Sequence, residues 1–288
     1  MKNLIFTLLA FAAVSFSFRA VATDSDAPVP YQWGVFKPVK NGTKDKVILE
    51  PWFTAEGQRR LARSHSKKDF YQLAHHYQPQ LTPVYAGVAS AVIVMNGVRL
   101  PTHAMKSQRE SEIAKPPALG GGIIPFPAYN QVNFFNEATD AVKNRKELGL
   151  QNVTPSNQND KSQFKPGTSL SELKGLLGVY QFTAVVQEAS AEPKLGAPAF
   201  RKVLKSVLSE NDHFLLANFK GDDLGASTEG TVSPLVAYDA QSDSVLVLDV
   251  TGHKNPWYWA PVDAFYRSMH TQYGAGTWRG WLTVSQTK

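Results

Sequence analysis

The segment that most constrains the fold of this chain runs from Val88 to Met95 and is apolar on nearly all sides. A turn-forming stretch containing Pro79 and Pro83 precedes it, and Asn96-Gly97 follows it as a C-terminal stop. A helix without an extended polar face has to be enclosed by other elements. The segment therefore predicts a buried helix and, with it, a folded domain with a substantial core.

Position 86 lies at the N-terminus of this predicted helix. Unpaired N–H groups and the helix dipole at such a position lower the pKa of a cysteine and stabilise a developing oxyanion. The residue there is Ala86, and the chain contains no cysteine at all. The position therefore has the electrostatic environment that favours a nucleophile, but the alanine side chain has no nucleophilic group.

The residues around this helix resemble the phytochelatin synthase family, in which the helix begins with a Gln-x-x-Pro-x-Tyr-Cys-Gly-x-Ala-Ser pattern. The resemblance extends from about Trp52 to Trp278. It continues in Gly121-Gly122, in residues 133–136 and 167–170, and in the block GTVSPLVAYDAQSDSVLVLDV, which ends at Val250. The residues that match the first pattern are Gln80, Pro83, Tyr85, Gly87, Ala89 and Ser90, with Ala86 in place of the cysteine.

The resemblance implies a papain-like α+β fold and Cys-His-Asp chemistry. In the family, the thiolate attacks glutathione, glycine leaves, and the γ-glutamylcysteinyl group passes to another glutathione or to water. By the same resemblance Ala86 occupies the nucleophile position, Thr231 the histidine position, Asp249 that of the orienting carboxylate and Gln80 that of the oxyanion-hole glutamine. The nucleophile and the base are therefore replaced, whereas the aspartate and the glutamine are retained.

These replacements predict a catalytically inactive family member that binds glutathione, another γ-glutamyl peptide, or a protein partner such as an active paralogue. Two further departures, Gly252 for an arginine and Thr82 for an acidic residue, bear on glutathione binding itself. An enzyme with a relocated nucleophile, at Ser90, Thr231 or Ser233, is the alternative hypothesis, although a threonine nucleophile needs an adjacent base. A structural protein with a closed cleft is the third.

The N-terminus predicts export. Lys2 precedes an apolar stretch from Leu4 to Phe18, and Ala20-Val21-Ala22 has the small-x-small pattern of a cleavage site. We expect a signal peptide over residues 1–22, cut after Ala22, and a single periplasmic domain over residues 23–288. No membrane span is expected after cleavage, because this apolar core is too short and no second such run follows.

Composition excludes several other functions. The formal charge of +6 falls to +4 without Lys2 and Arg19, and no stripe of Lys and Arg suggests a nucleic-acid partner. His75-His76, with His65 and His103, lack the ligand spacing of a metal site, so neither a metal nor another cofactor is expected.

The cluster Trp257-Tyr258-Trp259 has two interpretations, an aromatic wall for a ligand or a loop packed on the core.

Periodicity predicts helices followed by strands. We expect a cleft between a helical half and a sheet half, with Ala86 on one wall and Thr231 and Asp249 on the other. Thr168 or Ser169 is expected to cap a helix together with Glu172. The expected helices lie within residues 54–77, 131–148, 170–177 and 200–208, the antiparallel strands at 213–219, 233–238 and 244–250, and the loops at 115–127 and 151–165.

Overall fold

The computed structural model describes residues 36, 39–40, 46–98, 110–114, 117–148, 167–190, 196–226, 228–273 and 276–287. All of them belong to one compact unit, residues 33–288. The predicted signal peptide, His103 and the predicted loop 151–165 lie outside the described residues. Within the described ranges, no helix combines the length and apolarity needed to cross a membrane.

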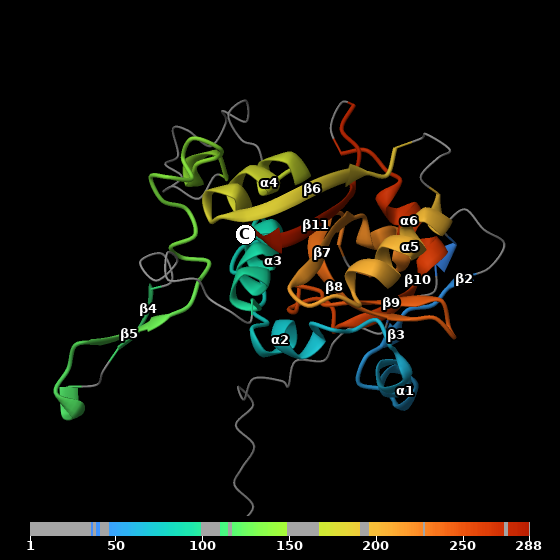
Figure 1. The fold of residues 1–288 in the computed structure, drawn as a ribbon, viewed down its shortest axis with the longest axis horizontal. Helices are drawn as coiled ribbons and strands as arrows, with labels where there is room; N and C mark the ends of the chain where they lie inside the picture. The colour runs from blue at the N-terminus through green and yellow to red at the C-terminus, as the bar shows by residue number, and fades with distance from the viewer. Residues whose placement is uncertain are drawn as a thin grey trace, which may run out of the picture. The chain divides into compact units, whose positions relative to one another are not determined.

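A seven-stranded antiparallel sheet forms the centre of the fold, in the order β3-β10-β9-β8-β7-β11-β6 (Figure 1). Together with the surrounding helices it confirms the predicted α+β class. Its strands are β3 (Glu50–Pro51), β6 (Phe182–Glu188), β7 (His213–Phe219), β8 (Thr231–Asp239), β9 (Ser244–Val247), β10 (Tyr258–Pro261) and β11 (Gly280–Gln286).

Both faces of this sheet are buried. Alternate side chains of β7 enter two separate hydrophobic clusters, Phe214 and Leu216 one and Leu215 and Phe219 the other. The near-continuous apolar run of β7 is the expected sequence of a strand covered on both sides. The prediction for β7 is confirmed, while β9 ends earlier than expected, at Val247, because the chain turns at Asp249.

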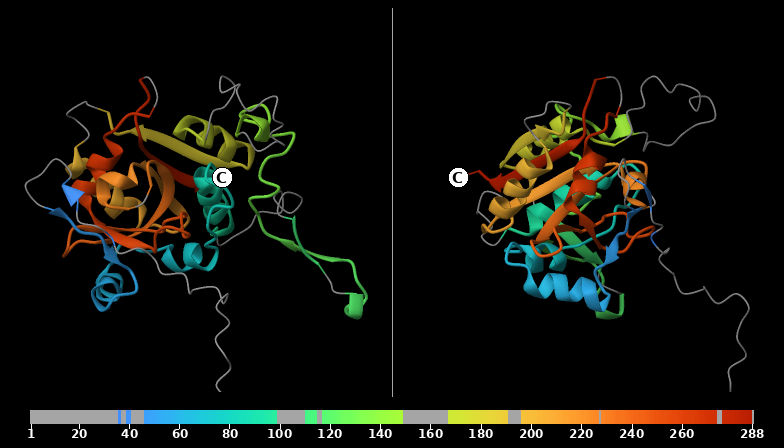
Figure 2. Two further views of the ribbon diagram at one scale, coloured as in Figure 1. Left: turned by 180° about the vertical axis from the view of Figure 1, so that it is seen from behind. Right: turned by 90° about the vertical axis from the view of Figure 1, so that its right-hand side faces the viewer.

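Helices cover the two faces. The buried helix α3 (Ala86–Asn96) belongs to the first cluster and packs on β8, and α4 (Leu170–Val179) packs on β6 and β11 (Figure 2). The second cluster includes α5 (Ala197–Val207) and α6 (Val262–Met269). Residues 87–95 of α3 are all buried, as their composition predicts.

The helix caps follow the sequence closely. The Ser169 side chain accepts the Glu172 N–H, and the Glu172 carboxylate accepts the Ser169 N–H, which confirms the predicted capping box. The predicted helical segment 54–77 contains two helices, α1 (Ala55–Arg63) and α2 (Phe70–His75). They are separated where Ser66 forms a β-bridge with Tyr238.

The predicted helix over residues 131–148 is wrong. This segment consists of bends and turns that end in a short 3-10 helix, η3 (Arg145–Leu148). The side chains of Asn130 and Asn136 each accept backbone N–H groups two and three residues ahead. Such local bonds compete with helix formation and outweigh the apolar spacing here.

The predicted loop 115–127 is also wrong in part. Its C-terminal portion is a strand, β5 (Ile123–Pro127), which pairs in antiparallel register with β4 (Glu110–Ala114). Gly120, Gly121 and Gly122 precede β5 with positive φ angles, which explains the glycines. The remaining short elements are β1 (Val39–Lys40), β2 (Lys46–Val47), η2 (Pro117–Leu119) and η6 (Gly221–Leu224).

Candidate functional site

The N-terminus of α3 and the start of β8 lie side by side. Ser90, one turn after Ala86, donates a hydrogen bond of 2.8 Å from its Oγ to the carbonyl oxygen of Val232. Val232 directly follows Thr231, so this bond holds the two replaced positions next to each other. The structure therefore brings together Ala86 and Thr231 as the sequence predicts.

A cleft of about 340 Å³ opens where these two elements meet. Ala86 and Gly87 contribute the first turn of α3, and Thr231 contributes the start of β8. The side chain of the N-cap residue, Tyr85, makes no capping hydrogen bond to this end of α3. The cleft is lined by Pro83, Val84, Ala86, Gly87, Gly167, Thr168, Asn218, Glu229, Gly230, Thr231, Val232, Tyr273 and Arg279.

Two buried hydroxyls in the cleft lack a hydrogen-bond partner within the described part of the chain. Thr231 is 4% exposed and Thr168 is 8% exposed, and the Oγ1 atom of each is buried without a partner. A buried hydroxyl without a partner is energetically unfavourable, by about 1–3 kcal/mol. Both residues line the cleft, and the hydrogen-bonding capacity of their hydroxyls is not used by any described residue.

Gly87 is required for this arrangement. A Cβ atom at position 87 would lie 2.0 Å from Thr168 Oγ1, far inside van der Waals contact. The absence of a side chain at position 87 thus allows Thr168 to approach the first turn of α3.

Arg279 supplies positive charge to the same cleft. Its Nη1 donates to Asn218 Oδ1 at 2.9 Å and its Nε to Thr271 Oγ1 at 3.1 Å, while its guanidinium lies 5.3 Å from the ring centroid of Tyr273. Burial lowers the pKa of Arg279 from its ordinary value. Among the described residues, no carboxylate lies within ion-pair distance of this guanidinium, although Asp223 interacts with it from farther away and Glu229 also lines the cleft. An anionic ligand group in the cleft would therefore be a direct ion-pair partner for Arg279.

Gly230 fixes the position of this guanidinium relative to Thr231. A Cβ atom at position 230 would lie 3.0 Å from Nη2 and 3.1 Å from Nη1 of Arg279. The guanidinium therefore packs directly against the backbone that precedes Thr231, which places a cation beside the unpaired hydroxyl.

Asp249 does not line the cleft, contrary to the predicted placement on its wall. Its carboxylate is fully buried and is held by its own loop: Oδ1 accepts the Thr251 N–H at 2.8 Å and the Thr251 hydroxyl at 2.6 Å, and Oδ2 accepts Asn255 Nδ2 at 3.2 Å. Burial raises the pKa of Asp249, and the hydrogen bonds from Thr251 and Asn255 offset only part of that effect. The aspartate stabilises the turn after β9.

Gln80 lies beside Asp249 rather than in the lining of the cleft. Its backbone N–H donates to the carbonyl oxygen of Val250 at 2.8 Å. Among the described residues, neither the buried Gln80 Oε1 nor the buried Thr82 Oγ1 has a hydrogen-bond partner.

The region around Gly252 is filled by Tyr77. The Tyr77 hydroxyl donates to the carbonyl oxygen of Asp249 at 2.8 Å, and a Cβ atom at position 252 would lie 2.5 Å from that hydroxyl. Burial raises the pKa of Tyr77 to about 12. A larger residue at position 252 would therefore displace Tyr77.

The aromatic cluster packs its loop onto the core. Trp257 contacts Trp52 and Tyr77, with ring centroids 5.3 and 5.0 Å apart, and the buried Trp259 donates from Nε1 to the carbonyl oxygen of Gly57. None of the three residues 257–259 lines the cleft. The loop-packing interpretation is the correct one.

The histidine pair forms no metal site in the structure. The rings of His75 and His76 meet edge to face at 4.7 Å. Across the described ranges, no three side chains of His, Asp or Glu are grouped closely enough to hold a metal ion.

Sequence analysis missed most of the polar lining of the cleft: Thr168 and Arg279, and also Asn218, Glu229 and Tyr273. Thr168 lies within a block that resembles the family, but only its helix-capping role was considered. Arg279 lies one residue beyond the end of the resemblance at Trp278. Its contact with Gly230 joins the last strand to the start of β8, and no local sequence pattern reports such a pairing.

Comparison with known proteins places these features in a family context. A family model described as phytochelatin synthase matches residues 48–111 and 124–281. The chain is 34% identical to glutathione gamma-glutamylcysteinyltransferase 1 of Arabidopsis thaliana, over 75% of this chain and 37% of that protein. It is 24% identical to glutathione gamma-glutamylcysteinyltransferase 3 of Lotus japonicus, over 76% of this chain and 38% of that protein. The chain thus spans about two fifths of the length of these relatives.

Proposed function

This chain is a member of the phytochelatin synthase family, and we propose that it binds a γ-glutamyl peptide such as glutathione without turning it over. The observation that carries the proposal is the combination at one cleft of Ala86 with two unpaired buried hydroxyls and the guanidinium of Arg279. The cleft retains groups for binding and has lost the group for covalent attack.

Acyl transfer by the family's mechanism needs a nucleophile at position 86, and a methyl group cannot attack a carbonyl. The alternative nucleophiles lack activation. The Ser90 hydroxyl donates to Val232, and the fully buried Ser233 accepts the Val250 N–H at 3.4 Å. Among the described residues that line the cleft, there is no histidine to activate Thr231.

The lining suits a peptide with a free carboxylate. A guanidinium binds a carboxylate through parallel N–H donors, and the neutral hydroxyls of Thr168 and Thr231 suit the C=O and N–H groups of an amide. The volume of about 340 Å³ lies in the range of small-molecule sites. The relatives are named for action on glutathione, which makes glutathione the first ligand to test.

We also propose, from the N-terminal sequence, that the protein is exported from the cytoplasm. The order of Lys2, an apolar core and Ala20-Val21-Ala22 supports a signal peptide over residues 1–22, a single domain over residues 23–288 and a periplasmic location. A protein partner, for instance an active paralogue, is the second candidate ligand, and the absence of a nucleophile at position 86 supports it equally.

Calorimetric titration of the purified protein with glutathione and γ-glutamylcysteine, with glycine release measured on the same samples, tests the proposal. We expect binding without glycine release above that of a boiled control. Arg279→Met should weaken binding at least tenfold, as loss of a charge-assisted bond does. Arg59→Met, an exposed arginine of α1 outside the cleft, is the matched control and should leave affinity unchanged.

Each contrary result has a definite meaning. Release of glycine above the control would refute inactivity and favour a relocated nucleophile. Failure of both peptides to bind would refute the γ-glutamyl ligand and leave the protein partner as the function to test.

A further inference from the structure

A second cavity, of about 480 Å³, shares no lining residue with the cleft. It lies where the C-terminal end of α1, the C-terminal end of α5 and the turn between β8 and β9 meet. We call it the α1–α5 pocket. The side chains that matter for its chemistry are Arg63, His65, Ser66, Lys205, Ser209 and Tyr238.

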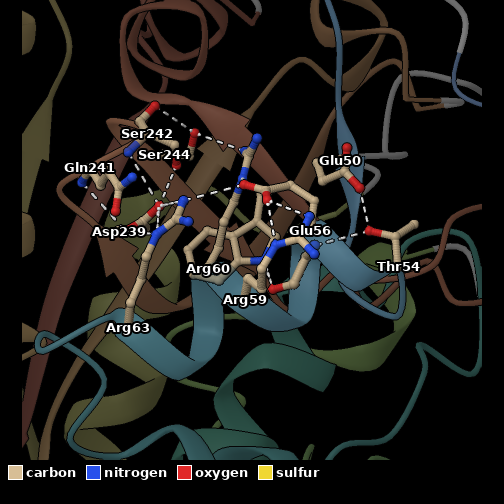
Figure 3. A network of polar contacts seen from close by, with 12 residues as sticks. Glu50, Thr54, Glu56, Arg59, Arg60, Arg63, Asp239, Gln241, Ser242 and Ser244 are labelled. Atoms are coloured by element: carbon tan, nitrogen blue, oxygen red, sulfur yellow. Dashed lines mark hydrogen bonds and ion pairs between the residues drawn. The ribbon is translucent and has the colours of Figure 1, made fainter.

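Arg63 is held rigidly at the edge of this pocket (Figure 3). Its Nε donates to Asp239 Oδ1 at 3.0 Å and its Nη2 to Asp239 Oδ2 at 2.6 Å. Asp239 is 2% exposed and also accepts the Ser242 N–H and hydroxyl. The same Nη2 also lies 3.3 Å from Glu56 Oε1, so Arg63 pairs with two carboxylates, and its Nη1 takes part in none of these bonds. A guanidinium fixed in this way loses little freedom when a ligand binds the remaining N–H groups.

Lys205 and His65 line the pocket, and the Lys205 ammonium interacts electrostatically with the carboxylate of Asp243, which does not line it. Within the described part of the chain neither has an ion-pair partner within 4.0 Å. The Lys205 Nζ lies 5.8 Å from the centroid of the Tyr238 ring. Among the described residues of the lining, Asp239 is the one carboxylate, and its bonds to Arg63 and Ser242 already occupy both oxygens. With histidine counted as neutral, the two cations Arg63 and Lys205 and this carboxylate give the lining a net charge of +1.

The hydroxyl groups of the pocket are also fixed in place. Ser209 Oγ donates to Ser66 Oγ at 3.0 Å, and Ser66 is paired through its backbone with Tyr238. The Tyr238 hydroxyl donates to Asp243 Oδ1 at 2.9 Å. Ser66 and Tyr238 thus form a rigid polar base beneath the cationic side chains.

We propose that the α1–α5 pocket binds a small molecule that carries a phosphate group. A phosphate offers several acceptor oxygens and up to two negative charges, which match donors that converge from three segments: the remaining N–H groups of Arg63, the Lys205 ammonium group and the Ser66 hydroxyl. A monocarboxylate would leave part of this set unpaired. The proposal goes beyond the peptide cleft and does not depend on it.

Inorganic phosphate, glycerol 3-phosphate and acetate, titrated at constant ionic strength into the purified protein, test this inference by calorimetry and thermal unfolding. The two phosphate compounds should bind and raise the melting temperature, and acetate should bind more weakly. Lys205→Met should weaken phosphate binding roughly fivefold or more, the effect of one unit charge at about 4 Å in a water-like medium. Lys202→Met is the matched control, because Lys202 is exposed on the same helix but does not line the pocket.

A second variant, Ser209→Ala, keeps all charges and should also weaken binding of both phosphate compounds. The inference is overturned if neither phosphate compound binds, if acetate binds as tightly as phosphate, or if Lys202→Met weakens binding as much as Lys205→Met. Binding of glycerol 3-phosphate but not of inorganic phosphate would assign the site to phosphate monoesters.

Discussion

Asp249 allows a sharp test of whether a retained catalytic residue serves the fold or the cleft. Asp249→Ala removes the acceptor of the buried Thr251 N–H and one of two acceptors of Asn255 Nδ2, whose other partner is Thr251 Oγ1. A stranded buried donor costs about 1–3 kcal/mol, and the small void adds to it. Removal of the buried carboxylate also removes its desolvation cost, which offsets part of this destabilisation. We therefore expect a loss of about 2–4 kcal/mol in the free energy of unfolding.

Asp249→Asn is the matched variant. Its side-chain oxygen still accepts both bonds from Thr251, while its NH₂ group replaces the acceptor of Asn255, so the loss should be about 1 kcal/mol. Urea unfolding measures both values, and calorimetric titration should show that each folded variant binds the peptide with unchanged affinity. Unchanged stability with lost binding would refute the structural role and return Asp249 to the cleft.

The difference in stability between the parent protein and Asp249→Asn should also change with pH, in a direction that the pKa of Asp249 predicts. Because burial raises the pKa of Asp249 in the folded state, the unfolded chain loses this proton first as pH rises. The contribution of Asp249 to stability is therefore largest below the ordinary aspartate pKa of 3.8 and declines as pH rises through the folded-state value. The stability deficit of Asp249→Asn, which has no such proton, should shrink between pH 4 and pH 7.

Three further predictions concern other parts of the structure. Gly230→Ala should weaken peptide binding about tenfold in calorimetric titration, because its Cβ would displace the Arg279 guanidinium. The free energy of unfolding should change little, because residue 230 is exposed. Equal affinity of the variant and the parent protein would contradict the role of Arg279. Glu172→Gln keeps the capping box but leaves the buried Lys143 ammonium without its carboxylate, 3.1 Å away, so urea unfolding should show a loss of about 2 kcal/mol. Burial acts to raise the pKa of Glu172, but hydrogen bonds from Ser169 and Lys143 lower it overall. The stability that this carboxylate contributes is therefore present above its ordinary pKa of 4.5 and is lost as pH falls through the folded-state pKa. A parent protein whose stability fell no faster below pH 4.5 than that of the variant would refute this. Ala86→Cys should place a thiol at the uncapped end of α3, and its alkylation by iodoacetamide at pH 7 should be faster than that of free cysteine; a slower rate would show that the helix end does not activate position 86.

Sequence analysis succeeded where local chemistry and burial agree. The apolar run after Ala86 can only be a buried helix, and Ser169 with Glu172 can only begin one. It failed over residues 131–148, where asparagine side chains captured backbone N–H groups that a helix would need. It also missed Arg279, whose place in the cleft depends on β11 lying beside β7 in the sheet, with residues 280–285 paired to 213–218. Long-range pairing of this kind leaves no trace in the neighbouring sequence.

The pattern of retained and replaced residues follows from where their side chains lie. Ala86 and Thr231 line the cleft, and neither side chain makes a hydrogen bond within the described part of the chain, so a different residue at either position would break no hydrogen bond of the fold. Asp249 has both oxygens committed to the turn after β9, and its replacement would strand buried donors. Its persistence is thus explained by the fold alone and is not evidence of remaining catalysis. Arg279 is different. No described carboxylate lies within ion-pair distance of its guanidinium, and burial lowers its pKa, so a bound anion would reduce the cost of burying this charge. The peptide hypothesis therefore depends on Arg279, Thr168 and Thr231, and not on the aspartate that the family uses for catalysis.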